Sequence, residues 1–448
     1  MRRGDLTEGS ILSGIWALAA PMLVAGLLSN SQNLIDMFWV GRLGPEAVAS
    51  VGMAATVMFL LSPFLMGVAT GTIALVGRAT GARQYEEANR AAGQSLMVAI
   101  LLGVVTGVAG LYLSRTVFSL LKPPPGVLED GVAFLRISLL GSVTLFVLFI
   151  GNSALQGAGD AWTPMWIMVV ANVLNLLLDP LLIFGLGPFP ALGVRGAAVA
   201  TVLSQAAAAV VSVRYLISGK TPLHVRLSQW RPDLTMSWRI LRIGIPGAGQ
   251  MVARSLVSAV MMTLVAGCGT AAVAAYSIGM RFHMIILMPA FALGGAAATM
   301  VGQSLGAGRP QRGQHAAWLA TAIDGGIMVA GAAFLMLLAP VLIGLFNHDA
   351  EVVAVGARYL RIISPFYIFA AAGVVLGRAL NGAGDSMAPM IITIVTLWGV
   401  QVPLAMLLAR VWQPATHGIW YAISASMLLN GILVTAWFMT GRWKHKRV

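Results

Sequence analysis

Charged side chains are scarce in this 448-residue sequence, at 10% of the residues, whereas a typical soluble domain carries about 25%. Hydrophobic residues make up 58%, and the mean hydropathy is +0.86. A chain of this composition has too few polar side chains to cover a water-exposed surface. The composition therefore excludes a soluble protein, and we expect the lipid bilayer to be its surroundings.

Cysteine and metal-binding patterns are also missing. Cys268 is the single cysteine, which excludes an internal disulfide and a cysteine metal cluster. The six histidines do not recur at the spacing of metal ligands. We expect no cleavable signal segment, because the first apolar run is too long for a signal peptide and no clear cleavage site follows it.

Long apolar runs fill most of the sequence. Twelve of them reach roughly 18 residues or more, enough to cross a hydrocarbon core of about 30 Å as a helix. Their approximate limits are 11–38, 46–73, 91–113, 131–151, 163–187, 195–217, 237–266, 271–297, 315–345, 355–377, 387–411 and 417–440. We predict an all-α membrane protein with twelve transmembrane helices.

The net charge of +13 indicates an orientation in the membrane rather than nucleic-acid binding. The basic residues lie in loops at helix ends, with no basic domain or aromatic-interleaved patch to hold a nucleic-acid strand. Eighteen of the 28 lysines and arginines fall at the termini and in even-numbered loops. By the positive-inside rule, we expect a multi-pass protein of the inner (cell) membrane with both termini in the cytoplasm.

The sequence matches itself without a gap after a shift of 225 residues. Pro21 then falls on Pro246, and the segment ALQGAGDAWTPM falls on ALNGAGDSMAPM. Each copy has six predicted crossings, an even number, so the copies are parallel repeats with a cleft expected between them. The predicted parts are an N-terminal six-helix lobe (1–217), a cytoplasmic inter-lobe linker (218–236) and a C-terminal six-helix lobe (237–448).

Buried charge distinguishes the first copy from the second. Asp36 and Asp179 of the first copy correspond to Met261 and Leu404 of the second. A charge near the centre of a membrane helix costs at least about 2.5–3.5 kcal/mol, so a charge that is retained usually faces a cavity or a partner. Helical spacing and similar depth place amide and hydroxyl side chains near the two carboxylates, namely Asn33, Asn172, Asn175 and Thr201.

Carboxylate, amide and hydroxyl oxygens form a set of hard ligands that suits Na⁺. The two carboxylates could instead hold a proton, because like charges repel in a low-dielectric pocket. The alternative without function is that Asp36 caps its helix and Asp179 bonds to nearby backbone. We predict an ion-coupling site at Asp36, Asn175, Asp179 and Thr201, with Asn33 and Asn172 as secondary residues. Pro21, on the same helix as Asp36, is the predicted hinge.

Two charged residues of the second copy are further candidates for ion coupling or substrate binding. Asp324 lies in an apolar run, where it would line the cleft or take a proton, or else pair with Arg254 or Arg281. Arg254 would either reach an anionic group in the cleft or be a snorkelling or paired arginine. Both alternatives stay open for each residue.

Two GAGD motifs suggest a different class, an intramembrane aspartyl protease. Asp160 and Asp385 lie in equivalent turns before Pro164 and Pro389, so a turn or helix-capping role explains them better. A catalytic pair would have to lie deep in the membrane and close together. We therefore predict no enzyme activity and no cofactor besides a coupling ion.

Several segments, spread over nearly the whole chain, resemble the multidrug and toxic compound extrusion (MATE) family. They are APMLVAGLLSNSQNLIDMFWVGRLGPEAVA, VGRATGARQYEEANRAA, ALQGAGDAWTPM, NVLNLLLDPLLIFGLG, VGQSLGAGRP and ALNGAGDSMAPM. The resemblance implies a two-lobed antiporter that exports cationic or amphipathic small molecules, such as drugs and toxins. It implies alternating access driven by inward movement of Na⁺ or H⁺. Small molecules are the expected partners, and the expected oligomeric state is a monomer.

The resemblance is nearer to the DinF-like branch of the family, in which the ion site lies in the N-terminal lobe. Carried over to this sequence, that site falls on Asp36, Asn175, Asp179 and Thr201. The NorM-like branch uses acids on the seventh and tenth helices, where this chain has none. The runner-up is a flippase of the same superfamily for a lipid or lipid-linked oligosaccharide. Such a flippase would need a broadly cationic cleft.

Overall fold

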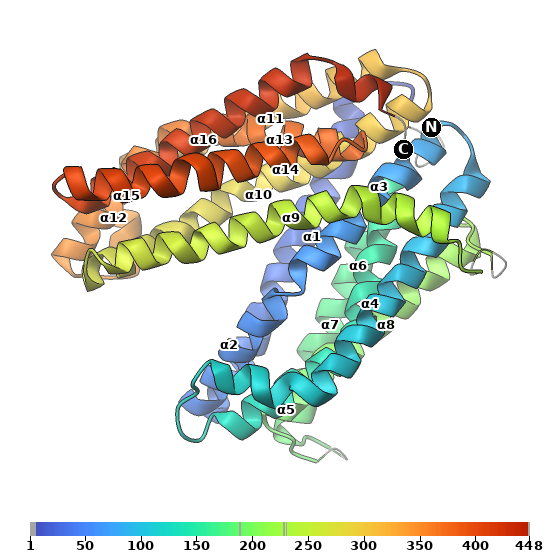
Figure 1. Cartoon of the computed structure of the whole chain (residues 1–448). Coiled ribbons are helices and arrows are strands. Elements are labelled where there is room, and N and C mark those ends of the chain that lie inside the picture. The colour runs from blue at the N-terminus through green and yellow to red at the C-terminus, as the bar shows by residue number, and fades with distance from the viewer. Residues whose placement is uncertain (1–5, 188–189, 227–228, 230, 447–448) are drawn as a thin grey trace. The chain divides into compact units, whose positions relative to one another are not determined.

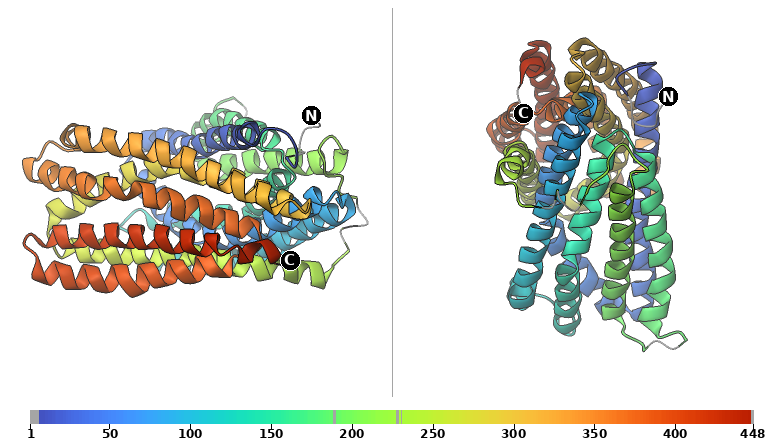
Figure 2. Two further views of the ribbon diagram at one scale, coloured as in Figure 1. Left: turned by 90° about the horizontal axis from the view of Figure 1, so that it is seen from above. Right: turned by 90° about the vertical axis from the view of Figure 1, so that its right-hand side faces the viewer.

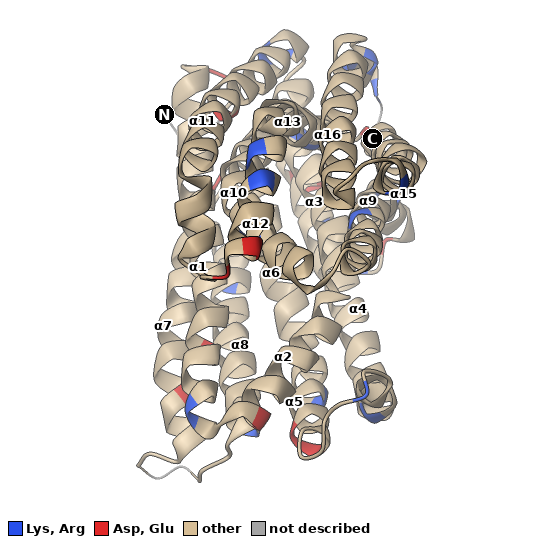
Figure 3. Cartoon of the chain, turned by 90° about the vertical axis from the view of Figure 1, so that its left-hand side faces the viewer, with Lys and Arg blue, Asp and Glu red and all other residues tan. Residues whose placement is uncertain are grey.

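The computed structural model describes residues 6–187, 190–226, 229 and 231–446, and all regular elements in this part of the chain are helices (Figure 1). Eleven helices are long and apolar enough to cross a membrane, and a pair bent by 46° makes up to a twelfth. The predicted all-α membrane fold with twelve crossings is therefore confirmed. Charged side chains occupy few positions along these helices (Figure 3).

The elements of the first repeat are α1 (Ile11–Val40), η1 (Gly41–Leu43), α2 (Pro45–Phe59), α3 (Ser62–Gly81), α4 (Tyr85–Leu120), α5 (Leu128–Leu140), α6 (Ser142–Gly157), α7 (Trp162–Phe184) and α8 (Val194–Ser218). Those of the second repeat are α9 (Leu234–Ala266), α10 (Thr270–Gly306), α11 (Pro310–Gly344), α12 (Ala350–Ile363), η3 (Ser364–Phe366), α13 (Tyr367–Gly382), α14 (Met387–Ile394), the π-helix η4 (Val395–Gln401), α15 (Val402–Val411), α16 (Ala415–Met439) and η5 (Arg442–His445).

Several predicted crossings are interrupted helices. The predicted span 46–73 consists of α2 and α3, which are separated at Leu60 and Leu61, and Pro63 stands in the first turn of α3. The span 131–151 is the bent pair α5 and α6, which meet at Gly141. Sequence periodicity does not reveal such breaks, since the hydrophobic run continues across them.

Contacts divide the chain into two compact units. Among the described residues, unit 1 comprises 20–187, 190–226, 229 and 231–244, and unit 2 comprises 6–19 with 245–446. The chain therefore passes from one unit to the other inside α1 and again inside α9. The two passages are 225 residues apart, like the repeats, and each lies directly before Pro21 or Pro246. The start of α1 thus belongs to unit 2, and the start of α9 belongs to unit 1. The lobes predicted at 1–217 and 237–448 did not include this exchange of helix starts.

Neighbouring helices lie side by side within each unit (Figure 2). In unit 2, α10 packs on α11 and α13, and α13 packs on α16. In unit 1, α6 packs on α3, α4 and α8, and α7 packs on α8. These bundles set the positions of the polar side chains described below.

Two arginines of unit 2 fasten the residues that precede α1. Arg312 of α11 donates hydrogen bonds at 2.9–3.0 Å to the backbone carbonyls of Leu6, Glu8 and Gly9. Arg309 donates to the carbonyl of Thr7 at 2.8 Å. A guanidinium group has five N–H donors in a fixed plane, so one side chain can hold several carbonyls. The start of α1 is thereby tied to unit 2.

A glutamine fastens the start of α9 to unit 1. The buried Gln94 of α4 donates to the backbone carbonyls of Gln229 at 3.0 Å and Arg231 at 2.7 Å. Its oxygen accepts a hydrogen bond from the backbone N–H of Asp233 at 3.0 Å. One amide side chain thus satisfies three backbone groups of the linker. Hydrophobic patterning does not predict these hydrogen bonds.

Gly382 ends α13 where this helix packs against α10. A β-carbon at Gly382 would lie 2.2 Å from the carbonyl oxygen of Ala298, whereas one at Gly377 of the same helix would meet no atom within 4 Å. We expect Gly382→Ala to lower stability by about 1–3 kcal/mol because of the overlap. The control, Gly377→Ala, should be neutral or slightly stabilising. Melting temperatures of the purified variants in detergent check this, and equal values for both would contradict it.

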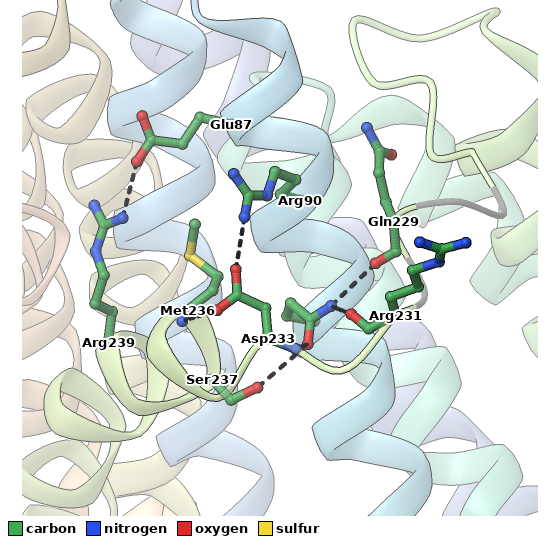
Figure 4. Close-up of polar contacts among 9 residues, drawn as sticks. Glu87, Arg90, Gln229, Arg231, Asp233, Met236, Ser237 and Arg239 are labelled. Atoms are coloured by element: carbon green, nitrogen blue, oxygen red, sulfur yellow. Dashed lines mark hydrogen bonds and ion pairs between the residues drawn. The ribbon is translucent and has the colours of Figure 1, made fainter.

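Asp233 precedes α9 and accepts a hydrogen bond from the backbone N–H of Met236 at 3.0 Å. This bond, with the Arg90 guanidinium 2.8 Å away, holds the pKa of the Asp233 carboxyl below its ordinary value of 3.8 (Figure 4). A carboxyl whose pKa is lowered on folding stabilises the protein above that ordinary value, and the contribution disappears as the pH falls below it.

We expect Asp233→Ala to cost about 1 kcal/mol at pH 7. The Asn variant should lose less, since an amide oxygen still accepts the bond from Met236. The deficit of the Ala variant should shrink as the pH is lowered from 5 to 3, followed by melting temperature. A deficit that stays constant over this range would show that the carboxylate charge is not involved.

Candidate functional site

Four polar side chains of unit 1 come together from α1, α7 and α8. The Thr201 hydroxyl donates to Oδ2 of Asp36 at 3.4 Å, and Nδ2 of Asn175 donates to Oδ1 of Asp179 at 3.2 Å. Asp36 also lies close enough to Asp179 and Asn175 to interact with both side chains. The structure therefore brings together the four residues predicted for ion coupling. We call them the acidic cluster.

The acidic cluster holds oxygen atoms that no donor satisfies. Asn175 and Asp179 are fully buried, and Asp36 is partly exposed. Oδ1 of Asp36, Oδ1 of Asn175 and Oδ2 of Asp179 have no hydrogen-bond partner. Buried polar atoms are nearly always satisfied, so three such acceptors in one place suit a positive ion or a proton donor.

Local sequence explains how α7 and α8 place these groups. A β-carbon on Gly196 would lie 2.3 Å from the carbonyl oxygen of Leu182, so α8 approaches α7 closely because position 196 has no side chain. Pro180 follows Asp179 inside α7 and cannot donate a backbone hydrogen bond to the carbonyl of Leu176. The helix thus carries an irregularity next to the most deeply buried carboxylate.

The residues predicted as secondary contributors lie differently. Asn33 is exposed and has no hydrogen bond to Asp36, so its predicted place beside that carboxylate is wrong. Asn172 is buried and donates to the carbonyl of Met168 at 2.9 Å, and its own Oδ1 has no partner. Gln32 was missed: it is buried, with an unpartnered amide nitrogen. Gln32 stands at i−4 from Asp36, a spacing that also places two side chains on one helical face, whereas the prediction used Asn33 at i−3.

The composition of the acidic cluster limits the ions that fit it. In the part of the chain that the structure describes, no three His, Cys, Asp or Glu residues gather as a metal site. Two carboxylates with an amide and a hydroxyl suit Na⁺ or a proton better than a transition metal. Two carboxylates at this range also repel each other when both are ionised. A single positive charge between them removes that repulsion.

Asp324 of α11 is fully buried, and neither of its carboxyl oxygens has a hydrogen-bond partner. The predicted alternative of an ion pair with Arg254 or Arg281 is therefore wrong. Burying an unpaired carboxylate is costly. Lining the cleft and binding a proton are the alternatives that stay as predictions for Asp324.

Arg254 of α9 is partly exposed, and it forms no hydrogen bond or ion pair with the other described residues. The predicted alternative of a paired arginine is therefore wrong for Arg254 too. The remaining alternatives are a snorkelling side chain and a group that binds an anion.

The two GAGD aspartates have structural partners. Asp160 accepts hydrogen bonds from the backbone N–H and the hydroxyl of Thr163, at 3.0 and 2.6 Å, at the start of α7. This is the capping role that the turn position predicted. Asp385 accepts from the indole of Trp437 at 3.0 Å and from Lys446 at 3.1 Å. Both carboxylates therefore have structural partners at the ends of their helices.

A second polar cavity, of about 870 Å³, lies in unit 1 where α4 and α9 begin. Its charged lining is balanced, with three residues of each sign: Arg83, Arg90, Arg239, Glu86, Glu87 and Asp233. Glu87 pairs with Arg239 at 2.9 Å, and Arg90 pairs with Asp233 at 2.8 Å (Figure 4). Paired charges of this kind attach helices and leave little net charge for an ion.

Two repeated helical bundles with an acidic cluster buried in one of them define a class, the membrane transporters built by duplication. The chain belongs to the MatE family, whose model matches residues 21–181 and 246–407. The two matched segments begin at Pro21 and Pro246, in the register of the repeat. Proteins of this family are transporters, so the expectation of a protein that is not an enzyme is confirmed.

Known relatives match nearly the full length. The probable multidrug resistance protein YoeA of Bacillus subtilis is 30% identical over 450 residues, covering 99% of this chain and 96% of the relative. The probable multidrug resistance protein NorM of Thermotoga maritima is 27% identical and covers 96% and 93%. Among solved structures, a MATE in the bent conformation has a TM-score of 0.92 at 26% identity and covers 98% and 97%.

If Na⁺ occupies the acidic cluster, it should stabilise the folded protein by about 1.4 kcal/mol for each tenfold rise in concentration above the dissociation constant. We expect the melting temperature at pH 8 to rise when NaCl replaces choline chloride. Asp36→Asn and Asp179→Asn should abolish the rise, whereas the control Asp160→Asn should keep it. A rise that survives in both cluster variants would show that Na⁺ binds elsewhere.

Proposed function

We propose that this chain is a cation-coupled antiporter that exports cationic or amphipathic small molecules, with Na⁺ or H⁺ as the coupling ion at the acidic cluster. The observation that carries the proposal is the group of buried, partnerless oxygens on Asp36, Asn175 and Asp179. Relatives named as multidrug resistance proteins support the export of small molecules. The position of the cluster in the first repeat supports the DinF-like branch.

The acidic cluster would work by binding a positive ion and releasing it again. An ion that arrives from outside binds between Asp36 and Asp179, removes their repulsion and draws α1 toward α7 and α8. Release of the ion on the other side restores the repulsion. The ion and the substrate are coupled when they have different affinities for the two arrangements of the protein, and no direct contact between them is required.

Helix α1 connects the cluster to the rest of the chain. Asp36 lies in the part of α1 that belongs to unit 1, and the first turns of α1 belong to unit 2. Pro21 lies at this passage and lacks the N–H that would bond the carbonyl of Ala17. A bend at Pro21 would therefore transmit a displacement of Asp36 along one continuous helix. The orientation with both termini in the cytoplasm of the inner membrane is part of the proposal.

A lipid or lipid-linked oligosaccharide flippase is the second candidate. It is favoured by one observation that the sequence did not reveal: Arg378, assigned to a loop by its position after the predicted span 355–377, lies inside α13. This partly exposed arginine adds to the cationic character of unit 2, and a flippase for an anionic lipid needs that character.

Transport in proteoliposomes under separately imposed Na⁺ and H⁺ gradients tests the proposal. We expect at least one gradient to drive uptake of fluorescent amphiphiles, for which rhodamine 123 and fluorescein are matched cationic and anionic probes. Asp36→Asn should slow the driven uptake by roughly 5- to 150-fold, the usual range of a coupling free energy. Thr201→Val should have a smaller effect, since it removes one neutral donor. Driven uptake at the wild-type rate in Asp36→Asn would refute the coupling role.

A further inference from the structure

Three basic side chains of unit 2 come from three different helices. They are Arg254 of α9, His283 of α10 and Arg378 of α13. The charge of Arg254 lies close enough to interact with both His283 and Arg378. We call these three residues the basic cluster.

No acidic residue neutralises the basic cluster. Neither Arg254 nor Arg378 forms a hydrogen bond or an ion pair with any residue that the structure describes. Asp324, the buried acid within the helices of unit 2, has no hydrogen-bond partner either. His283 lies 3.1 Å from the hydroxyl of Tyr367, a neutral group. Unpaired arginines within membrane helices are rare and usually mark a substrate or ion pathway.

Aromatic rings accompany these basic groups. The Arg378 guanidinium lies 5.0 Å from the centre of the Phe291 ring. Trp398 donates its indole N–H at 3.2 Å to the carbonyl of Ala253, the residue before Arg254. Phe291 and Trp398 are 41% and 37% exposed. Unit 2 therefore offers apolar aromatic surface beside partly exposed cationic donors.

The basic cluster is confined to the second repeat. The residues at the corresponding positions of the first repeat are Ser29, Met58 and Ser153, none of which is basic. The acidic residues show the opposite distribution, since Asp36 and Asp179 correspond to Met261 and Leu404. Divergence after the duplication thus left the acidic cluster in one repeat and the basic cluster in the other, and the second repeat also has the buried Asp324. Packing alone does not explain this division, because neutral side chains fill the same positions in the sister repeat.

We infer that unit 2 contains a binding site for the anionic group of an aromatic amphiphile, with Arg254 and Arg378 as the charged donors. Guanidinium groups match the planar oxygens of carboxylate, sulfonate and phosphate. The aromatic rings would hold the apolar body of the ligand. This inference rests on the proposed transport function and narrows its substrates to compounds that carry a negative group.

Binding of fluorescein, an aromatic anion, tests the site, with rhodamine 123 as the cationic counterpart. We expect saturable binding of fluorescein, measured by fluorescence anisotropy, to the protein in phosphatidylcholine nanodiscs. Arg254→Gln and Arg378→Gln should each weaken it by roughly tenfold or more. The control is Arg281→Gln on α10, an exposed arginine whose guanidinium lies 6.0 Å from the Phe346 ring. It should change binding by less than about twofold.

Melting temperatures show whether the variants are folded. Arg254→Lys is a milder change that keeps the positive charge, so this variant should bind fluorescein better than Arg254→Gln. Equal affinities for fluorescein in the wild type and in both glutamine variants would overturn the inference. Stronger binding of rhodamine 123 than of fluorescein to the wild type would overturn it too.

Nanodiscs that contain phosphatidylglycerol distinguish a lipid headgroup from a soluble anion. If a lipid headgroup is the natural occupant, phosphatidylglycerol should compete with fluorescein and weaken its binding to the wild type. It should have no such effect on the Arg254→Gln variant. If a soluble anion is the occupant, fluorescein should bind equally well in both lipids. Either result requires the basic cluster.

The transport assay separates this inference from the proposed function. Gradient-driven transport of rhodamine 123 without any binding of fluorescein would remove the anion site and leave coupled export in place. Binding of fluorescein through Arg254, without movement of either probe under either gradient, would leave the site and remove coupled export.

Discussion

The repulsion between the carboxylates of Asp36 and Asp179 is the interaction on which the proposed function of the molecule depends. Both groups sit among helices where water is scarce, so their charges are weakly screened. The neighbouring Asn175 and Thr201 supply one hydrogen bond each and leave other oxygens free. A site that is incompletely satisfied in this way is ready to bind a positive ion and to release it.

Clusters of opposite charge in the two repeats would give the duplicated fold two separate tasks under the proposals made above. The acidic cluster belongs to unit 1, and the basic cluster belongs to unit 2. A coupling ion and an anionic substrate would therefore bind to different residues and would not compete. Exchange between them would arise from the conformational change, which is the thermodynamic requirement for coupling between two sites.

The sequence predicted the acidic cluster well because an ionised residue in an apolar helix is conspicuous. The same reasoning gave Asn33 in place of Gln32, since helical spacing alone does not fix which of two adjacent residues faces inward. Arg378 was assigned to a loop because apolar character fades before α13 ends at Gly382. The histidines lack the sequence spacing of metal ligands, and this test does not detect the neighbours of His283. These neighbours, Arg254 and Tyr367, lie far away in the sequence.

The number of crossings and the repeat could also be predicted, since both follow from hydrophobic runs and from residue identity at a fixed shift. The breaks within crossings could not, because the chain stays apolar through Leu60 and Gly141. The hydrogen bonds of Gln94 and Arg312 to distant backbone carbonyls have no local pattern at all. Hydrogen bonds of this kind, between a side chain and a backbone group far away in the sequence, can be recognised only in the three-dimensional structure.

The exchange of helix starts between the units bears on how the protein is made. During synthesis the first turns of α1 emerge long before α10 and α11, against which they belong in unit 2. Unit 1 in turn is incomplete until the beginning of α9 has been translated. Neither half is therefore a self-sufficient folding unit. Separately expressed halves, cut in the linker, would have to trade segments before either could reach its native bundle.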